Sequence, residues 1–249
     1  MIDLLSLESY CNEVLQVDEF NDYCPNGLQV EAAQQVEKLM LGVTACQALI
    51  QAAEEWGADA LLVHHGYFWK GEGLALRGLK ANRVGALFRQ RTALLAYHLP
   101  LDAHQTYGNN RQLGERLGLL PANPVAEGSL IWQTSLSEPI SVTELTQRIA
   151  DRLHRRPTHI APNERPLKRI GWCTGAAQDA ILEAAGQGLD AYISGEISEQ
   201  TVHLARELGI HYFAAGHHAT ERYGVQALGR HLAERFSLEY RFVDVENPV

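Results

Sequence analysis

The chain has 249 residues, of which 46% are hydrophobic and 20% charged, and its formal net charge at pH 7 is −9. This length suits one large domain or two modest ones with a sizeable hydrophobic core. The negative charge disfavours broad, non-specific binding to nucleic acid, which needs many Lys and Arg contacts to phosphates, although it leaves room for a local basic patch.

The ends and the cysteines indicate the compartment. The amino terminus carries no basic segment, and the longest apolar runs have the length of strands, so no signal peptide and no membrane partner is expected. The four cysteines form no Cys-x-x-Cys pair and suggest no disulfide framework. We therefore expect a cytoplasmic protein whose cysteines act mainly as small buried hydrophobes.

Hydrophobic periodicity predicts a chain in which strands and helices alternate. An amphipathic helix is predicted at 5–17. Strands are predicted at 41–44, 60–63 and 93–97, and a helix at 83–91. A proline-rich stretch follows, with a predicted strand, helix and short strand at 130–136, 142–153 and 157–160. The last predicted elements are strands at 171–174, 191–194 and 210–214 and a helix at 199–208.

The order of these elements repeats within the chain. In each copy a strand ending in Thr is followed by Gln, a helical pattern, Gly, Asp and a second apolar run. The spacing from Gln47 to Asp59 is twelve residues, as is that from Gln178 to Asp190. Each copy therefore predicts a βαβ unit with parallel strands and a right-handed crossover.

The repeat leads to an α/β fold with two similar halves, mainly parallel sheets flanked by helices, and a metal site between the halves. We expect a first α/β half at 1–120, a linking or extension segment at 121–165 and a second α/β half at 166–249. The middle segment stands apart because residues 121–166 hold six of the nine prolines.

Histidines and acids gather where the predicted parallel strands end, which is where α/β sheets bind ligands. Both copies follow a strand with His-x-x-x-acid. The residues expected at these ends are His64, His65, His98, Asp102, Glu196, His217 and Glu221. Imidazole and carboxylate ligands together suit Zn, Mn, Fe, Co or Ni. A single histidine after a strand is more often a hydrogen-bonded structural residue, which is the simpler interpretation of His98 alone.

Local geometry favours two metal ions over one. His64 and His65 would point to opposite sides of a straight strand, so one ion would struggle to bind both. If a helix begins at or near Gly216, His217 and Glu221 share one face of its first turn, whereas Pro100 argues against a regular helix between His98 and Asp102. A carboxylate such as that of Glu221 is the expected bridge between paired ions.

Side chains beside the histidine pair suggest a substrate pocket. The aromatic rings of Tyr67 and Trp69 are candidates for stacking on a planar ring, and Lys70 for contacting a phosphate. A packed loop with an exposed lysine explains the same residues equally well. Glu196 and His98 are candidate groups for moving protons in a reaction.

The motifs of this chain resemble those of one known family across essentially its whole length. They are Asn26-Gly27-Leu28-Gln29-Val30, Gly42-Val43-Thr44, His64-His65-Gly66-Tyr67-Phe68-Trp69-Lys70-Gly71, His98-Leu99-Pro100-Leu101-Asp102, Gly195-Glu196 and Gly216-His217-His218-Ala219-Thr220-Glu221. The chain resembles the GTP cyclohydrolase I type 2 homologue family, also called the NGG-one-interacting-factor-three-like family, in its bacterial YbgI type. The resemblance implies a dinuclear metal centre, bound by His64, His65, Asp102, His217 and Glu221.

The resemblance also implies a toroidal homohexamer, a GTP cyclohydrolase-like activity on a nucleotide or related heterocycle, and a role in handling damaged nucleotides or in DNA repair. The leading hypothesis is therefore a hydrolase that uses two divalent metal ions on a small-molecule substrate. One alternative is a non-catalytic, metal-stabilised ring that binds DNA or a protein, for which DNA binding gains no support from the net charge of −9. A second alternative is metal storage or delivery.

Overall fold

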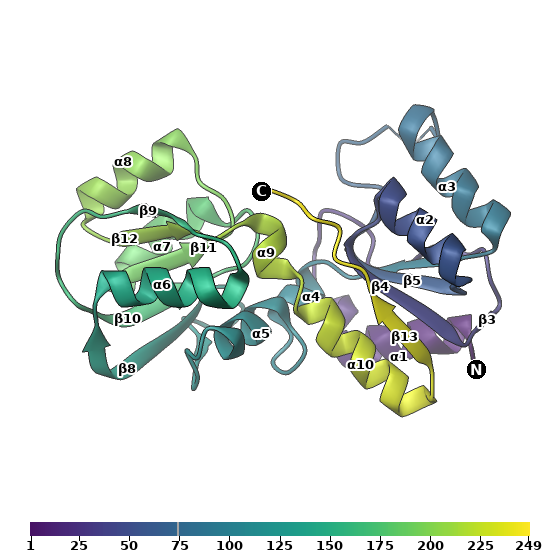
Figure 1. Ribbon diagram of the computed structural model, residues 1–249, viewed down its shortest axis with the longest axis horizontal. Coiled ribbons are helices and arrows are strands. Elements are labelled where there is room, and N and C mark those ends of the chain that lie inside the picture. Colours follow the sequence, from purple (N-terminus) through teal and green to yellow (C-terminus); the bar gives the residue numbers. More distant parts are fainter. Residues whose placement is uncertain (74) are drawn as a thin grey trace. The chain divides into compact units, whose positions relative to one another are not determined.

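The computed structural model describes residues 1–73 and 75–249, which form two compact units (Figure 1). The first unit combines Met1–Gly108 with Gly224–Glu246, and the second combines Asn109–Tyr223 with Asn247–Val249. Each unit has a sheet with helices on both faces, as an α/β fold requires in order to bury both sides of its sheet.

The first unit contains a five-stranded sheet in the order β13-β4-β5-β6-β2. Its strands are β2 (Gly27–Val30), β4 (Lys38–Thr44), β5 (Ala60–His65), β6 (Ala93–Ala96) and β13 (Glu239–Phe242), and a separate two-stranded sheet pairs β1 (Ile2–Asp3) with β3 (Gln35–Val36). Its helices are α1 (Leu4–Leu15), the 3-10 turn η1 (Val17–Glu19), α2 (Gln47–Trp56), α3 (Gly78–Gln90), α4 (Leu99–Ala103) and α10 (Gly224–Phe236). β13, β4, β5 and β6 run parallel to one another, and the edge strand β2 is antiparallel to β6.

The second unit contains a six-stranded sheet in the order β7-β8-β10-β11-β12-β9. Its strands are β7 (Asn123–Pro124), β8 (Trp132–Ile140), β9 (Thr158–Ile160), β10 (Leu167–Trp172), β11 (Ala191–Ser194) and β12 (His211–Ala214). Its helices are α5 (Asn109–Arg116), α6 (Val142–Leu153), the 3-10 turn η2 (Gln178–Ala180), α7 (Ile181–Gly186), α8 (Glu199–Leu208) and α9 (His217–Glu221). The central strands β10, β11 and β12 are parallel, and the outer strands are antiparallel to their neighbours.

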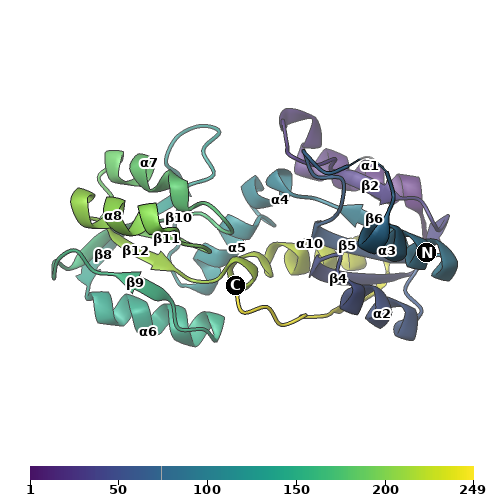
Figure 2. The same ribbon diagram turned by 90° about the horizontal axis from the view of Figure 1, so that it is seen from above.

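Alternating side chains of each central strand feed two hydrophobic clusters, one on each face of the sheet. In the first unit, Leu39 and Leu41 of β4 pack with α1 and α10, whereas Met40 packs with α2 and α3. In the second unit α5 and α6 cover one face, and α7 and α8 cover the other. Figure 2 shows this second arrangement, with α6 on the opposite side of the sheet from α7 and α8.

The predicted internal repeat is confirmed by the order and direction of the strands. β4-α2-β5-α3-β6-α4 in the first unit corresponds to β10-α7-β11-α8-β12-α9 in the second, with parallel strands in both. The aspartate at the end of each repeated helix has the same structural task. Asp59 Oδ2 accepts hydrogen bonds from the backbone N–H groups of Glu37 and Lys38, each at 2.9 Å. Asp190 Oδ2 accepts from those of Lys168 and Arg169, at 2.8 and 2.7 Å.

The two units follow boundaries that differ from the predicted ranges 1–120, 121–165 and 166–249. The reason is a reciprocal exchange, because the last helix of the first half belongs to the second unit, and the last helix and strand of the second half belong to the first unit. α10 and β13 pack on β4 in the first unit, and α5 and β7 belong to the second. Glycines permit the close packing, since a Cβ at Gly229 of α10 would overlap Leu41 and one at Gly114 of α5 would overlap Trp172. The segment at 121–165 is therefore part of the second unit's sheet and helical layer.

Most predicted elements are present with shifted ends. The helices predicted at 142–153 and 199–208 match α6 and α8, and the strand at 191–194 matches β11. Strand β8 runs from Trp132 to Ile140, later than the predicted 130–136, and α3 starts at Gly78 rather than at 83. Within the described residues, no helix has the combined length and apolar character needed to cross a membrane.

We expect the replacement D190A to destabilise the protein by about 2 kcal/mol, since it removes a charged acceptor from two backbone N–H groups. Chemical unfolding monitored by circular dichroism measures this loss. E207A is the matched control, because Glu207 is an exposed acid of α8. An equal effect of the two replacements would contradict the structural role given to Asp190.

The stability of the second unit should also depend on pH through His159, whose ring stacks 5.4 Å from that of His211 and 4.3 Å from that of Phe213. Burial, with a smaller contribution from His211, lowers the pKa of His159 from 6.5 to about 4. The unfolded chain thus binds a proton at a higher pH than the folded one, and the unfolding free energy falls as the pH drops from 6.5 towards 4.

The replacement H159F keeps a stacked ring and removes the titrating group. Urea unfolding at several pH values should therefore show a shallower decrease between pH 6.5 and 4 for H159F than for the unchanged protein. H203Q, at an exposed histidine of α8, serves as the control. An unchanged slope in H159F would refute this assignment.

Candidate metal centre

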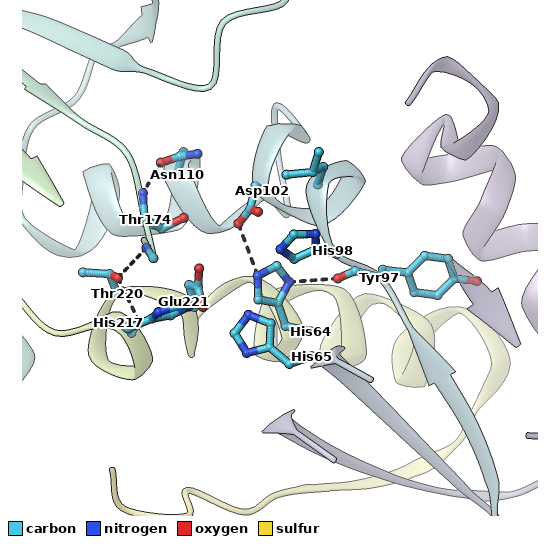
Figure 3. A network of polar contacts seen from close by, with 12 residues as sticks. His64, His65, Tyr97, His98, Asp102, Asn110, Thr174, His217, Thr220 and Glu221 are labelled. Atoms are coloured by element: carbon cyan, nitrogen blue, oxygen red, sulfur yellow. Dashed lines mark hydrogen bonds and ion pairs between the residues drawn. The ribbon is translucent and has the colours of Figure 1, made fainter. Parts of the chain in front are cut away.

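His64, at the end of β5, is a buried histidine with an oxygen on each side of its ring. Its side chain is 0% exposed. Nδ1 lies 2.8 Å from the carbonyl oxygen of Tyr97, and Nε2 lies 3.5 Å from Oδ1 of Asp102 (Figure 3). A backbone carbonyl can only accept, so Nδ1 carries a proton, and in the neutral ring the lone pair of Nε2 faces the carboxylate.

His65 lies beside His64 rather than on the opposite side of the sheet. The two ring centroids are 4.5 Å apart. β5 ends at His65, so the alternation of side chains along a straight strand does not separate these two rings. The Nδ1 atom of His65 is 3.2 Å from the Thr44 hydroxyl of the adjacent strand. Together with His98, the pair forms a group in which one ligand atom of each ring lies within 4.8 Å of the others.

Asp102 reaches this group from helix α4, which the sequence argued against. Pro100 occupies the first turn of α4, where its missing N–H needs no partner, so the proline starts the helix instead of breaking it. Asp102 is only 6% exposed. The interruption expected between His98 and Asp102 is therefore wrong, and the helix fixes the direction of the carboxylate.

His98 is held by a carboxylate that the sequence did not single out. Its Nδ1 lies 2.7 Å from Oδ1 of Asp22, whose side chain is 2% exposed. Burial alone would raise the pKa of Asp22, but hydrogen bonds from His98, Asn26 and the N–H of Leu99 outweigh it and lower the pKa to about 2. Asp22 is therefore an ionised acceptor in the structure.

In the second unit, His217 and Glu221 lie on the short helix α9, as their spacing predicted. Gly216, with φ +101°, precedes the helix. His217 Nε2 is 3.0 Å from Oε2 of Glu221, and its Nδ1 is 2.6 Å from Oε1 of Glu196. Burial alone would lower the pKa of His217, but Glu221 and then Glu196 raise it to about 9.

Two glycines leave room around these side chains. Gly175, with φ +68°, follows β10, and a Cβ there would overlap Oε1 of Glu221. A Cβ at Gly195 would overlap the backbone of Gly175 and of His217. The Thr220 hydroxyl accepts a hydrogen bond of 3.1 Å from the Gly175 N–H, which ties the β10 loop to α9 (Figure 3). The loops of the repeat thus form a close cradle for Glu221.

One pattern is common to all four candidate histidines. Nδ1 of each ring has an oxygen partner: Tyr97 O for His64, Thr44 Oγ1 for His65, Asp22 for His98 and Glu196 for His217. Metal-binding histidines almost always use their second nitrogen in this way, which leaves Nε2 for the ion. The side chains therefore fit a metal ion, and the groups of His, Asp and Glu are of the kind that could hold one.

The predicted pocket residues divide into two kinds. The ring of Tyr67 is 5% exposed and its hydroxyl donates to the carbonyl of Ala45 at 2.7 Å, so it packs in the core of the first unit. Trp69 is half-buried, 4.9 Å from the ring of His98 and 5.8 Å from that of His65, and Lys70 is exposed. Only Trp69 of these three contacts the candidate histidines.

Sequence reasoning missed the loop that precedes β2. Besides the Asp22 contact, Asn26 Oδ1 accepts from the His98 N–H at 2.6 Å, and Gln29 exchanges hydrogen bonds with the backbone of Tyr67. The signal in the sequence was the Asn26-Gly27-Leu28-Gln29 motif, because the predicted local structure gave its polar side chains no role.

The chain is similar to known proteins over nearly its whole length. Residues 2–248 match the family described as Duf34/NIF3 (NGG1p interacting factor 3). A protein of Allochromatium vinosum named "GTP cyclohydrolase 1 type 2 homolog" is 50% identical over 249 residues, covering 100% of this chain and 98% of the relative. A protein of the same name from Escherichia coli K12 is 47% identical over 243 residues, covering 97% and 98%.

Solved structures share the fold along the whole chain. The structure described as "protein ybgI, unknown function" is 45% identical, covers 100% of both chains and has a TM-score of 0.96. TTHA1606 from Thermus thermophilus is 30% identical, with the same coverage and a TM-score of 0.92. This chain therefore belongs to the Duf34/NIF3 family, alongside the proteins named GTP cyclohydrolase 1 type 2 homolog.

Proposed function

We propose that this protein is a metal-dependent hydrolase that holds two divalent ions and acts on a nucleotide or a related heterocycle. The proposed ligands are His64, His65 and Asp102 of the first unit and His217 and Glu221 of the second. The observation that carries the proposal is the shared hydrogen bond between Nδ1 and an oxygen, present at His64, His65 and His217. It leaves the same nitrogen of each ring for an ion.

The number of donors supports a site with open positions. Three side chains of the first unit and two of the second serve the same pair of ions in this proposal, with Glu221 as the bridge. The assignment across units rests on the repeated strand ends in the sequence and on the donor types. Five side chains do not fill the coordination of two ions, because a zinc ion alone takes four ligands or more, and the remaining positions suit water and substrate.

The chain's own residues would then bind the substrate and orient the metal ligands. When bound, a pair of ions polarises the substrate and brings the pKa of water towards neutrality. Glu196 keeps His217 oriented through its 2.6 Å hydrogen bond, Trp69 offers a ring face beside His65 and His98, and Lys70 offers a charge for a phosphate. Tyr67 supports the loop from within the core of the first unit.

The names of the relatives supply the substrate class. Each is named "GTP cyclohydrolase 1 type 2 homolog". The proposal takes from this name hydrolysis of a nitrogen heterocycle carried by a nucleotide, with damaged nucleotides as one candidate source. The cytoplasmic location and the homohexamer stay predictions.

Metal analysis and turnover together test the proposal. The protein loaded with Zn, Mn, Fe, Co or Ni should bind two ions per chain and hydrolyse a member of a panel of intact and damaged nucleotides. H64A and E221A should each lose bound metal and activity, since each removes a proposed ligand. H203A, at an exposed histidine of α8, should keep both.

Two outcomes would contradict this assignment. A protein that binds two ions but turns over no nucleotide would favour the alternative, a metal-stabilised ring that binds DNA or a protein. A protein whose metal content is unaffected by H64A or E221A would remove the metal centre itself from these residues.

A second experiment concerns the orientation of His217. We expect E196A to weaken metal binding by about 10- to 100-fold, the range found when an outer hydrogen-bond partner of a ligand is removed. Competition with a chelator of known affinity measures the change. E199A, at a neighbouring exposed acid, should have no such effect, and equal affinities of the two variants would show that Glu196 does not support a ligand.

A further inference from the structure

The loop before β2 is bound to the loops that follow β5 and β6. Asn26 and Asp22 accept hydrogen bonds from the backbone N–H groups of His98 and Leu99, at 2.6 and 2.9 Å. Lys70 donates its N–H to the carbonyl of Tyr23 at 2.6 Å. This loop thus fixes both the backbone of His98 and the carboxylate beside its ring.

Every hydrogen bond described at Asp22 has the carboxylate as acceptor. Oδ1 accepts from the N–H of Tyr23 at 2.6 Å and Oδ2 from the Asn26 amide at 2.8 Å and the Leu99 N–H at 2.9 Å. The fourth partner, Nδ1 of His98, lies 2.7 Å from Oδ1. A carboxylate without a proton can only accept, so Nδ1 of His98 is a donor, and in the neutral ring the lone pair is on Nε2.

The His98 ring lies against the candidate metal ligands of its own unit. Its centroid is 5.1 Å from that of His64 and 5.8 Å from that of His65 (Figure 3). Trp69 covers it edge-on at 4.9 Å, with the two ring planes at 86°. His98 is 14% exposed at its side chain, so it remains accessible to a small molecule while its direction is set by Asp22.

We propose that Asp22 is a positioning residue that holds the His98 imidazole in its Nδ1–H form and aims Nε2 at the His64–His65 group, where His98 accepts a proton and is not itself a metal ligand. The role of His98 in a reaction rests on the proposed function, whereas its tautomer does not. In the reaction, an O–H bond of a water breaks as an Nε2–H bond forms, the water oxygen bonds to the substrate carbon, and the carboxylate of Asp22 stabilises the imidazolium. The bond from that carbon to the leaving nitrogen then breaks, and Nε2 returns the same proton to that nitrogen.

A rival interpretation is that Asp22, Cys24 and His98 bind an additional metal ion, since one ligand atom of each lies within 4.8 Å of the others. The contacts disfavour it. Both oxygens of Asp22 already accept hydrogen bonds, and an ion there would have to displace them. Cys24 is 8% exposed, and burial, with a smaller contribution from Asp22, raises the pKa of its thiol to about 12, which disfavours the thiolate that a metal needs.

The replacement D22N makes the proposal testable because it turns one oxygen into an NH2 group. Apart from His98, two donors, from Asn26 and Leu99, point at Oδ2, whereas one, the Tyr23 N–H, points at Oδ1. The position of Oδ2 therefore favours the amide oxygen, which satisfies more of these donors there. The NH2 group then faces Nδ1 of His98, which must become the acceptor. D22N should therefore reverse the tautomer of His98 and place the proton on Nε2.

Nitrogen-15 NMR of the metal-free protein measures the tautomer directly, because protonated and lone-pair ring nitrogens differ widely in chemical shift. H98N identifies the His98 signals. We expect Nδ1–H in the unchanged protein and in C24S, the control at the neighbouring side chain, and Nε2–H in D22N. A proton on Nε2 in the unchanged protein would overturn the proposal without any mutation. An unchanged tautomer in D22N would show that Asp22 does not set it.

Metal stoichiometry of the reconstituted protein separates the proton acceptor from a ligand. H98N should bind as many ions as the unchanged protein, whereas H64A should bind fewer. Loss of an ion in H98N would make His98 a ligand and overturn the second part of the proposal. Loss of an ion in C24S would establish the rival site. If no nucleotide is hydrolysed but the NMR result holds, the proposed function fails and the positioning role of Asp22 stands.

Discussion

The arrangement of the candidate site depends on one kind of interaction, the hydrogen bond between a histidine Nδ1 and a fixed oxygen. An imidazole can rotate and exchange tautomers, so it presents a defined nitrogen only when the other is occupied. The partners in this chain come from different sources: a backbone carbonyl for His64, a hydroxyl for His65 and carboxylates for His98 and His217. Each lies on the strand or loop next to its histidine. The sheets thus supply the orientation as well as the position.

The repeat explains why both units carry such residues. In each, a left-handed glycine, Gly57 or Gly188, follows the helix. The aspartate two residues later accepts hydrogen bonds from the backbone at the start of the preceding strand, which fixes the strand register. Once the register is set, the carboxyl ends of the parallel strands meet at one edge of the sheet. The exchange of α5 and α10 then makes each unit complete only with a segment from the other half of the sequence. Gly114 and Gly229 allow that exchange at equivalent positions on β10 and β4.

Sequence patterns predicted the repeat, most of the elements and the strand-end histidines, because these depend on local periodicity and on chain order. They did not predict the membership of α5 and α10, since the apolar face of a helix does not reveal which sheet it covers. The prediction at Pro100 failed because the same residue that breaks a helix interior is compatible with a first turn. Asp22 was missed for a different reason. Its partner His98 is 76 residues away, and nothing in local spacing connects a loop before β2 with one after β6.

Buried carboxylates link the site to the energetics of the fold. Glu221 and Asp102 are 3% and 6% exposed, and an ionised carboxylate so far from water needs a positive or hydrogen-bonding partner. In the metal-free chain His217 meets this need for Glu221. The nearby carboxylate of Glu221 raises the pKa of His217 to about 9 despite burial. A divalent ion would replace that proton with a larger charge, so metal binding and the stability of the second unit are expected to be coupled. The fold thus keeps these acids and histidines buried although burial costs free energy for their charged forms. A bound cation stabilises the buried group.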